Sequence, residues 1–507
     1  MKRWITFAMA AVMLFTLTAC GRQNIEPEIE GTRIALSDEA ITVDGTAAAT
    51  EETAAVYVGH DIVYYHAGQD LTYGEGTAED AHDAAEADGH TVVHITQPGT
   101  YVLSGTLSAG QIAVDLGEDA ETDPAAVVTL VLDGVDITST VAPGIIFYRV
   151  YECDTAETAS MEVDTSAAGA NIVLAEGTEN TVNGSYVARI YKSCTLSEDG
   201  TEVVESKKLH KYDGAVYSRM SMNVSGDGAL NINAENEGLD TERHLTVNSG
   251  RINIISGNDG INTNEDGVSV TTINGGEVQI TVSGSTGEGD GIDSNGWLVI
   301  NGGCVTAWAC ATSGDSGIDA DNGVYINGGT VIAGGNMLDP LEGEQNYAVF
   351  RFAAQQTAGQ TYTLKNAAGD TVLSAQPVNG FSYLVLSYPE LTEGEYTLWR
   401  GEEQLSGTEE AGMGQRPEQG AAPEMPEGME APPQAPNGAM PEPPEGQPGD
   451  MTAPEKPDGE RPDGVPADAM QPPQMPDGMP NAPGERADGE VSEIFNIVSG
   501  GNRFVIA

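Results

Sequence analysis

The sequence predicts an all-β protein whose main domain is a parallel β-helix, and two observations favour this fold. First, similar units recur with their glycine turns at spacings of 26, 27 and 26 residues, which is typical of a solenoid. The four turns are Asn248-Ser249-Gly250, Asn274-Gly275-Gly276, Asn301-Gly302-Gly303 and Asn327-Gly328-Gly329. Second, inward aliphatic residues alternate with other residues on both sides of each turn, as they do along strands.

The offsets from the turn define the strands of each unit. One residue before the turn stand Val247, Ile273, Ile300 and Ile326. A unit of this length with three short strands cannot bury its apolar face alone, whereas stacked units with strands ~4.8 Å apart can. Helical repeats would need apolar residues spaced by three and four, and far fewer Gly and Asn within each unit.

The charge of the chain limits its partners. The 507 residues include 63 glycines and carry a formal net charge of -57. Such acidity argues against nucleic acid, because phosphate binding requires a basic surface. It favours a neutral partner, or one that is bound through a divalent cation.

Residues 1–20 are predicted to be a lipoprotein signal peptide. Lys2-Arg3 precede an apolar stretch from Ile5 to Leu17, which is too short to span a bilayer, and Leu17-Thr18-Ala19-Cys20-Gly21 follows. That ending resembles a bacterial lipobox, so Cys20 is the expected lipidation site and the protein is expected to be exported and anchored at the bacterial cell surface. Two or more acyl chains would hold it stably on a membrane. An ordinary signal peptide cleaved nearby is the alternative.

The rest of the chain divides into segments of different composition. The expected segments are a leader and N-terminal cap at 21–90, the parallel β-helix at 91–336 with an insertion at 149–214, a small β cap at 345–407, a disordered low-complexity segment at 408–490 and a terminal β-hairpin at 491–507. The disordered segment is predicted because 411–490 holds 19 of the 26 prolines and no aromatic residue.

Acidic and amide residues recur at fixed offsets within the repeats. Each repeat opens with a glycine followed by an inward aliphatic residue, and we call this pair the opening. The next residues, Asp240, Asn262, Asp293 and Asp319, are expected to form an outward row. Two residues later come Glu242, Asn264, Asn295 and Asp321 as a second row. Before the glycine of each opening come Glu237, Asp259 and Asp290, with Asp315 one position earlier in the last copy.

These rows predict a calcium site. Carboxylates about one strand apart repel by roughly 1 to 3 kcal/mol per pair. Calcium takes roughly six to eight oxygen ligands from carboxylates, amides, backbone carbonyls and water. The predicted Ca²⁺ ligands are Asp240, Asp259, Asn262, Asp290, Asp293 and Asp319. An acidic solvated face, with Asp and Gly serving the corners, is the alternative.

Two tryptophans, Trp297 and Trp308, face outward by the same offset rule. Flat aromatic rings suit sugar rings, so both are candidate carbohydrate-binding residues together with the second row, Glu242, Asn264, Asn295 and Asp321. The alternative for the tryptophans is burial beneath an inserted loop or the cap.

The motifs resemble those of a known family. The motifs that carry the resemblance are Gly238-Leu239-Asp240-Thr241, Asn274-Gly275-Gly276, Asp290-Gly291-Ile292-Asp293-Ser294, and the upstream segments 101–107 and 174–181. Over roughly residues 34–405 they resemble the bacterial carbohydrate-binding β-helix family typified by a clostridial polygalacturonate-binding and cellulose-binding protein. The resemblance implies a right-handed parallel β-helix similar to that of pectate lyases, calcium binding, and attachment to acidic plant polysaccharide. Many relatives carry Lys where Asp240 and Asp293 stand, which leaves the ligand preference open.

Three functions follow from these features. The favoured one is calcium-dependent binding of polygalacturonate or pectin, with cellulose as a further ligand. The second is an enzyme, either a calcium-dependent lyase or a hydrolase. A lyase needs a base beside the metal, where only Arg243 and His244 are basic. A hydrolase would need a suitably spaced pair of carboxylates. The third is a non-catalytic adhesin or spacer.

Overall fold

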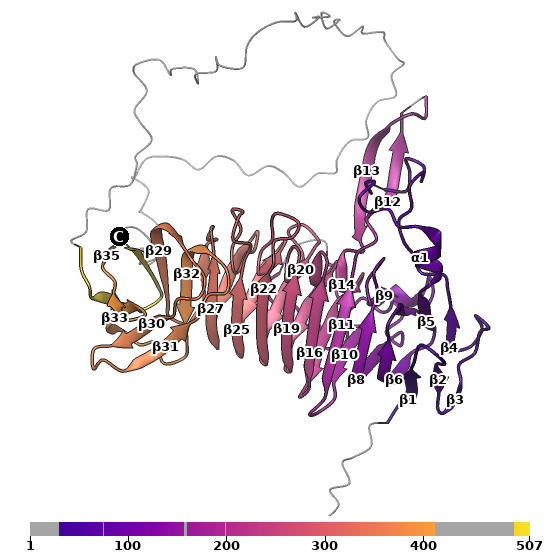
Figure 1. The fold of residues 1–507 in the computed structure, drawn as a ribbon, viewed down its shortest axis with the longest axis horizontal. Coiled ribbons are helices and arrows are strands. Elements are labelled where there is room, and N and C mark those ends of the chain that lie inside the picture. The colour runs from indigo at the N-terminus through magenta and orange to yellow at the C-terminus, as the bar shows by residue number, and fades with distance from the viewer. Residues whose placement is uncertain (1–29, 75, 157–159, 198, 411–490, 507) are drawn as a thin grey trace, which may run out of the picture. The chain divides into compact units, whose positions relative to one another are not determined.

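The computed structural model describes residues 30–74, 76–156, 160–197, 199–410 and 491–506 (Figure 1). Regular structure in this part of the chain is nearly all β, with only α1 (Ala84–Asp88) and the short 3-10 helix η1 (Ala120–Thr122) as helices, so the predicted all-β class is confirmed. No helix among these residues is long and apolar enough to cross a membrane. The predicted signal peptide with Cys20, and almost all of 408–490, lie outside the described residues.

Successive repeats pair with one another mainly through parallel strands, which form three rows. The first row is a sheet of β4 (Val56–Gly59), β5 (Thr91–Ile95), β7 (Gly110–Asp115), β9 (Ile145–Arg149), β14 (Gly214–Ser218), β17 (Glu237–Thr241), β20 (Ile261–Thr263) and β23 (Ile292–Ser294). Only β4 pairs antiparallel in this row, because it closes the N-terminal end. Each of the predicted repeats therefore adds strands at the edge of the preceding one.

The second and third rows belong to one larger sheet. The second row is β1 (Thr32–Leu36), β6 (Gly99–Leu107), β8 (Val128–Thr138), β10 (Ala170–Leu174), β15 (Met222–Gly226), β18 (Leu245–Val247), β21 (Val270–Ile273), β24 (Trp297–Ile300), β26 (Gly323–Ile326) and β28 (Leu341–Glu342). The third continues from β6 and β8 into β11 (Glu179–Gly184), β16 (Ala229–Ala234), β19 (Arg251–Ser256), β22 (Glu277–Val282), β25 (Cys304–Trp308) and β27 (Thr330–Gly335). The short β2 (Thr42–Val43) and β3 (Thr46–Ala47) extend β1 as an antiparallel edge.

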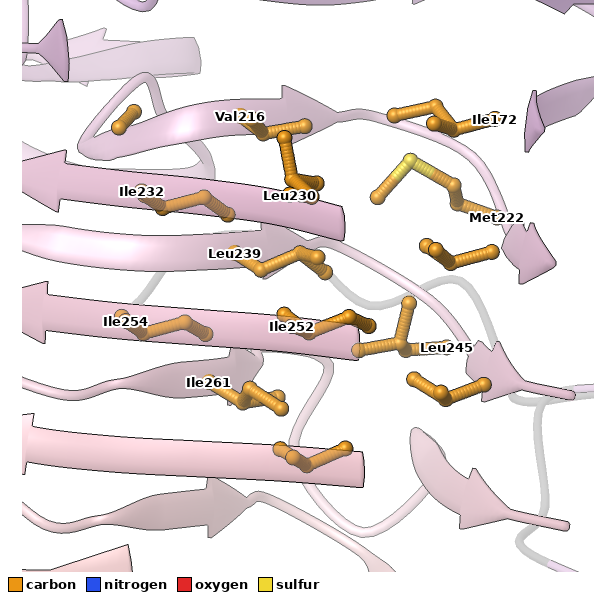
Figure 2. Packing of buried hydrophobic residues seen from close by; sticks show 14 of the residues in the cluster. Ile172, Val216, Met222, Leu230, Ile232, Leu239, Leu245, Ile252, Ile254 and Ile261 are labelled. Carbon is orange, nitrogen blue, oxygen red and sulfur yellow. The ribbon is translucent and has the colours of Figure 1, made fainter. Parts of the chain in front are cut away.

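The core lies between the rows and is built from the same position in each repeat. Leu239, Leu245 and Ile252 come from the three strands of one repeat, and all three are fully buried. Figure 2 shows them in rows with their equivalents from neighbouring repeats, such as Ile261 below Leu239. The alternation predicted from the sequence therefore places the aliphatic residues in the core and leaves the intervening residues on the outer face.

Glycine at the start of each repeat opening is required by a close backbone approach. A Cβ on Gly238, Gly260 or Gly291 would overlap the carbonyl oxygen of the equivalent glycine in the next repeat. We therefore expect Gly291→Ala to lower the free energy of unfolding by about 1 to 3 kcal/mol, the usual cost of overpacking. Chemical denaturation measures this, with Gly314→Ala as control because a Cβ there meets nothing. Equal stability of the two variants would show that the repeats have room to separate.

The predicted insertion at 149–214 is only partly correct. Residues 170–184 contribute β10 and β11, which pair in parallel with β8 on one side and with β15 and β16 on the other. The true additions are 150–169 and the segment after β11, which forms the antiparallel hairpin of β12 (Arg189–Leu196) and β13 (Val203–Lys211). The basic and aromatic residues of that hairpin obscured the regular strands before it.

The C-terminal strands cover the end of the rows. In the large sheet β29 (Tyr347–Gln356), β32 (Phe381–Ser387), β35 (Gly407–Glu409) and β37 (Gly501–Ile506) follow β27. A separate sheet contains β30 (Tyr362–Asn366), β31 (Thr371–Ala375), β33 (Gly394–Arg400), β34 (Glu403–Gln404) and β36 (Phe495–Ile497). The two sheets share a core rich in aromatic residues.

The predicted terminal hairpin is wrong, although both of its strands exist. β36 pairs with β33, whereas β37 pairs with β29 and β35, so the two strands belong to different sheets. Phe495 and Phe504 nevertheless pack together, with ring centroids 4.9 Å apart. The two strands therefore contact each other through their apolar side chains. In the predicted hairpin they would have been joined by backbone hydrogen bonds.

Candidate functional site

Strands β17, β20 and β23 place the predicted first row of polar residues side by side. Asp240, Asn262 and Asp293 are in register, one residue after the buried aliphatic positions. Asp319 lies outside the regular strands, but its backbone N–H donates to Ile292 O at 2.7 Å, as a residue of a further parallel strand would. Asp319 therefore extends the row. The fixed offset in the sequence therefore becomes adjacency in space.

Burial of this row differs from the expectation. Asp240 has no exposed surface and Asn262 is 3% exposed, so the prediction of a solvent-facing row is wrong for these two, and the flanking Asp259 is also buried. Asp293 and Asp319 are half-buried. The offset rule identified the outer side of the strand correctly, but not the polar residues and loops that cover it.

The second row contributes to this cover. Asn264 Nδ2 donates to Asp240 Oδ1 at 2.7 Å and Asn264 Oδ1 accepts from Asn262 Nδ2 at 3.0 Å. Asn295 Nδ2 donates to the carbonyl of Asn264 at 2.9 Å, and Glu242 accepts from the hydroxyl of Tyr217 at 2.6 Å. Asp321 alone in this row is exposed. Asn264 thus holds Asp240 and Asn262 in place, and Asn295 in turn holds Asn264, a role that the sequence did not indicate.

A first group of acids, which we call the N-terminal acidic cluster, consists of Asp213, Glu237 and Asp240. One carboxylate oxygen from each lies within 4.8 Å of the other two. Gly214 permits this approach, because its Cβ would lie 2.5 Å from that of Asp240. The prediction missed Asp213, although it precedes Gly214 as Glu237 precedes Gly238, and upstream extension of the alignment would have found it.

A second group, the C-terminal acidic cluster, consists of Asp259, Asp290, Asp293, Asp319 and Asp339. Asp259 Oδ1 accepts from the backbone N–H of Asp290 at 2.7 Å, and Asp290 Oδ1 accepts from that of Ser316 at 2.5 Å. These acids therefore connect each repeat to the next. Asp339 was missed because it follows the last repeat, where no offset could be aligned.

Burial and mutual repulsion perturb two carboxyls of the C-terminal acidic cluster. Desolvation and the charge of Asp259 raise the pKa of Asp290 to about 9. Desolvation and the neighbouring carboxylates of Asp339 and Asp293 raise the pKa of Asp319 to about 8. Without a cation, both carboxyls therefore hold a proton more readily than an exposed aspartate does. A divalent cation would offset the repulsion and favour their ionised forms.

The available donors fit a hard cation. Both clusters offer only carboxylate oxygens, and Asn262, in register between Asp240 and Asp293, adds an amide oxygen. Calcium prefers such oxygens over nitrogen or sulfur. Asn262 Oδ1 and Asp319 Oδ1 are buried and accept no hydrogen bond from any described residue. Since a buried acceptor without a partner is costly, such oxygens are suited to cation ligation.

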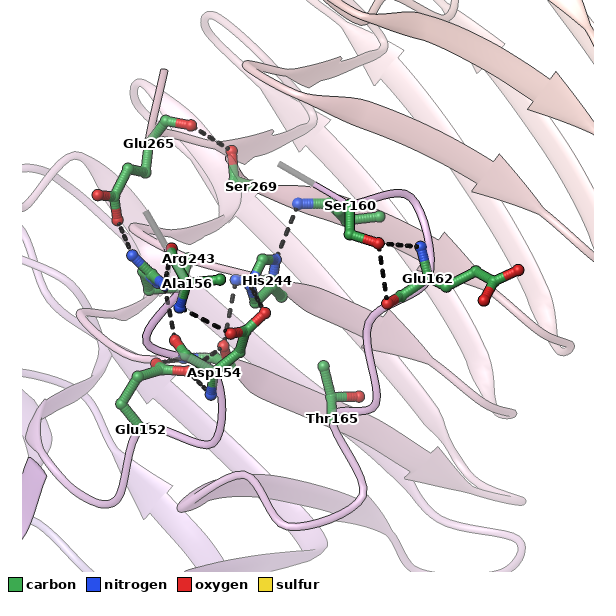
Figure 3. A network of polar contacts seen from close by, with 12 residues as sticks. Glu152, Asp154, Ala156, Ser160, Glu162, Thr165, Arg243, His244, Glu265 and Ser269 are labelled. Carbon is green, nitrogen blue, oxygen red and sulfur yellow. Dashed lines mark hydrogen bonds and ion pairs between the residues drawn. The ribbon is translucent and has the colours of Figure 1, made fainter. Parts of the chain in front are cut away.

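The basic residues beside the acids are engaged elsewhere (Figure 3). Arg243 Nη1 contacts Glu265 at 2.5 Å, and Nη2 donates to the carbonyl oxygens of Asp154 and Ala156 at 2.6 and 3.1 Å. His244 is 1% exposed, and its Nδ1 accepts from the backbone N–H of Val270 at 3.1 Å. Burial and the charge of Arg243 lower the pKa of His244 to about 4. His244 Nε2 also lies 3.4 Å from a carboxylate oxygen of Asp154. Both side chains therefore attach the segment after Glu152 to the repeats.

The two candidate tryptophans have different environments. Trp297 begins β24 on the outer side and is half-buried. Trp308 is 2% exposed, and its ring packs against Phe381 of the C-terminal strands, with ring centroids 5.7 Å apart. The assignment of Trp308 to carbohydrate binding is therefore wrong, and the alternative of burial beneath the cap applies. Only Trp297 keeps surface for a ligand.

Comparison with known proteins identifies the family. The model of the carbohydrate-binding domain-containing protein family matches residues 88–376, more than half of the chain. A carbohydrate-binding domain-containing protein from Acetivibrio thermocellus is 31% identical over 177 residues, which cover 34% of this chain and 49% of that protein, so the chain spans about half the length of this relative. A solved structure of a polysaccharide lyase-like protein from C. thermocellum, a gadolinium derivative, has 19% identity and a TM-score of 0.33 over 62% of this chain and 90% of that one. The chain belongs to the carbohydrate-binding domain-containing protein family.

Proposed function

We propose that the protein binds carbohydrate in a calcium-dependent manner at its acidic clusters. The observation that carries the proposal is the C-terminal acidic cluster, where burial, together with repulsion from neighbouring carboxylates, raises the pKa of Asp290 to about 9 and that of Asp319 to about 8. Calcium would be held there by Asp259, Asp290, Asp293 and Asp319, and at the upstream positions by Asp240 and Asn262. The bound ion would retain open coordination positions for a ligand oxygen. Membership of the carbohydrate-binding family supports a sugar as that ligand.

The proposed ligand is an acidic plant polysaccharide, polygalacturonate or pectin. A surface this acidic repels uronate carboxylates, and a calcium ion between the two would reverse the interaction. Trp297 supplies an apolar ring for a sugar face near Asn295, and Asp321 supplies an exposed acceptor for its hydroxyls. We further propose that the parallel rows form a right-handed parallel β-helix that Cys20 anchors at the bacterial cell surface.

The proposed activity is binding without cleavage. A lyase requires a free base beside the metal, whereas Arg243 is held by Glu265 and two backbone carbonyls, and His244 is buried. Removing Arg243 from these contacts would leave an acidic residue and two carbonyls without their donor. The geometry therefore favours a positioning role for both residues.

Incubation with homogalacturonan and Ca²⁺ tests this proposal. We expect retention of the protein on the polysaccharide, loss of retention with a chelator, and no release of reducing or unsaturated ends. Arg243→Ala serves as the comparison. Turnover that disappears in this variant while its melting temperature is unchanged would identify a lyase, and retention that is insensitive to chelator would contradict the calcium dependence.

A further inference from the structure

A groove runs along the outer face of the second row, away from both acidic clusters. Its volume is about 560 Å³, its floor is formed by outward residues of β10, β15, β18, β21, β24 and the turns after them, and the segment 161–166 lies along one side. The floor positions are in register from Asn223 through Thr246 and Thr272 to Val299. Asn223 and Thr246 are buried, since Thr165 bonds to both, so the half-buried Thr272 and the asparagines of the turns are what the groove presents to a ligand.

The turns after these strands form an asparagine ladder. Nδ2 of Asn274 donates to Oδ1 of Asn248, Asn301 donates to Asn274, and Asn327 donates to Asn301, each at 3.0 Å. One N–H and one carbonyl lone pair of each interior amide remain for other partners, since an amide offers two donors and two acceptor sites. Asn248, Asn274 and Asn301 are exposed. The ladder is thus a regular array of fixed donors and acceptors.

The side wall is held in a defined position. Thr165 Oγ1 donates to Asn223 Oδ1 at 2.8 Å and lies 2.7 Å from Thr246 Oγ1, while Asn223 Nδ2 returns a bond to Thr165 O at 2.8 Å. Arg243 attaches the preceding part of the same segment through the carbonyls of Asp154 and Ala156. The groove is consequently pre-formed, which lowers the entropic cost of binding.

The lining determines the charge of the ligand. No described residue that lines the groove is basic, and Glu162 and Asp164 on the wall are acidic. An anionic sugar would be repelled there, whereas hydroxyl groups can both donate to and accept from the amides and threonines. Neighbouring amides are spaced by one strand separation, ~4.8 Å. A pyranose in an extended 1,4-linked chain advances by nearly the same length.

We propose that this groove is a second binding site, which takes an uncharged, extended 1,4-linked glycan along the asparagine ladder without a metal. Hydroxyls of successive sugar rings bond to successive amides, and the half-buried Thr272 contacts a ring face. The proposal extends the carbohydrate binding proposed above, but it differs in site, in ligand charge and in metal requirement.

Calorimetry with cellohexaose in the presence of a chelator tests the proposal on the full-length protein. We expect binding that added calcium leaves unchanged. Asn274→Ala combined with Asn301→Ala is expected to weaken it roughly tenfold or more, through loss of two ligand hydrogen bonds. Thr272→Phe is expected to abolish it by filling the floor, and should fold because aromatic residues suit strands.

Asn253→Ala is the matched control, because Asn253 donates to Asn231 at 2.8 Å in a similar ladder on the third row, outside the groove. It is expected to retain wild-type affinity. Absence of cellohexaose binding, dependence on calcium, or unchanged affinity of Thr272→Phe with an unchanged melting temperature would overturn the proposal. Calcium-dependent retention on homogalacturonan, measured in parallel, succeeds or fails independently and reports only on the acidic clusters.

Discussion

Calcium is expected to stabilise the wild-type protein strongly and to have little effect on a variant that carries Asp293→Asn and Asp319→Asn. At 100-fold excess over its Kd, an ion that binds only the folded state contributes about 2.7 kcal/mol. In the variant two charges are removed at nearly constant side-chain size. With a chelator present the variant should be at least as stable as the wild type, because the repulsion around Asp290 and Asp319 is relieved.

Thermal unfolding with and without Ca²⁺ measures both effects. The control is Asp136→Asn combined with Asp227→Asn, which removes two charges from exposed positions outside the clusters. This control should keep the full calcium response. If the variant of Asp293 and Asp319 also kept it, along with wild-type affinity for homogalacturonan, the acids would be only a solvated face.

Trp308→Ala is expected to cost about 3 to 5 kcal/mol of stability, as is usual for a buried tryptophan. The ring fills the contact between β25 and the C-terminal strands, against Phe381 and over Gly334, where a Cβ would overlap it. Chemical denaturation should therefore show a large loss. Binding to homogalacturonan in calcium should persist at temperatures where the variant is folded, because the ring has no free face.

Trp297→Ala is the comparison, since its side chain is half-buried on the outer side of β24. We expect a smaller loss of stability and a weaker affinity for the polysaccharide. The opposite result, with Trp308→Ala weakening affinity at unchanged stability, would restore Trp308 as a sugar contact.

For the four repeats between residues 236 and 335, the sequence alone determined the strands and their alignment. The offsets that place Asp240, Asn262 and Asp293 one residue after an aliphatic position are local properties, because side chains alternate along a strand and stacking preserves the alternation. The glycines that open the repeats could likewise be predicted, because the backbones of neighbouring repeats must approach closely there. For this reason the first polar row lies in register as its spacing predicted.

Only the tertiary structure decided which outward positions are covered. Alternation assigns Asp240 and Trp308 to the outer side of their strands, but it contains no information about segments that later pack there. The same applies to Asp339, which joins the C-terminal acidic cluster from beyond the last repeat, and to Thr165, which fixes the groove wall from an irregular segment. These contacts join residues far apart in the chain whose neighbours share no repeating pattern, so periodicity could not reveal them.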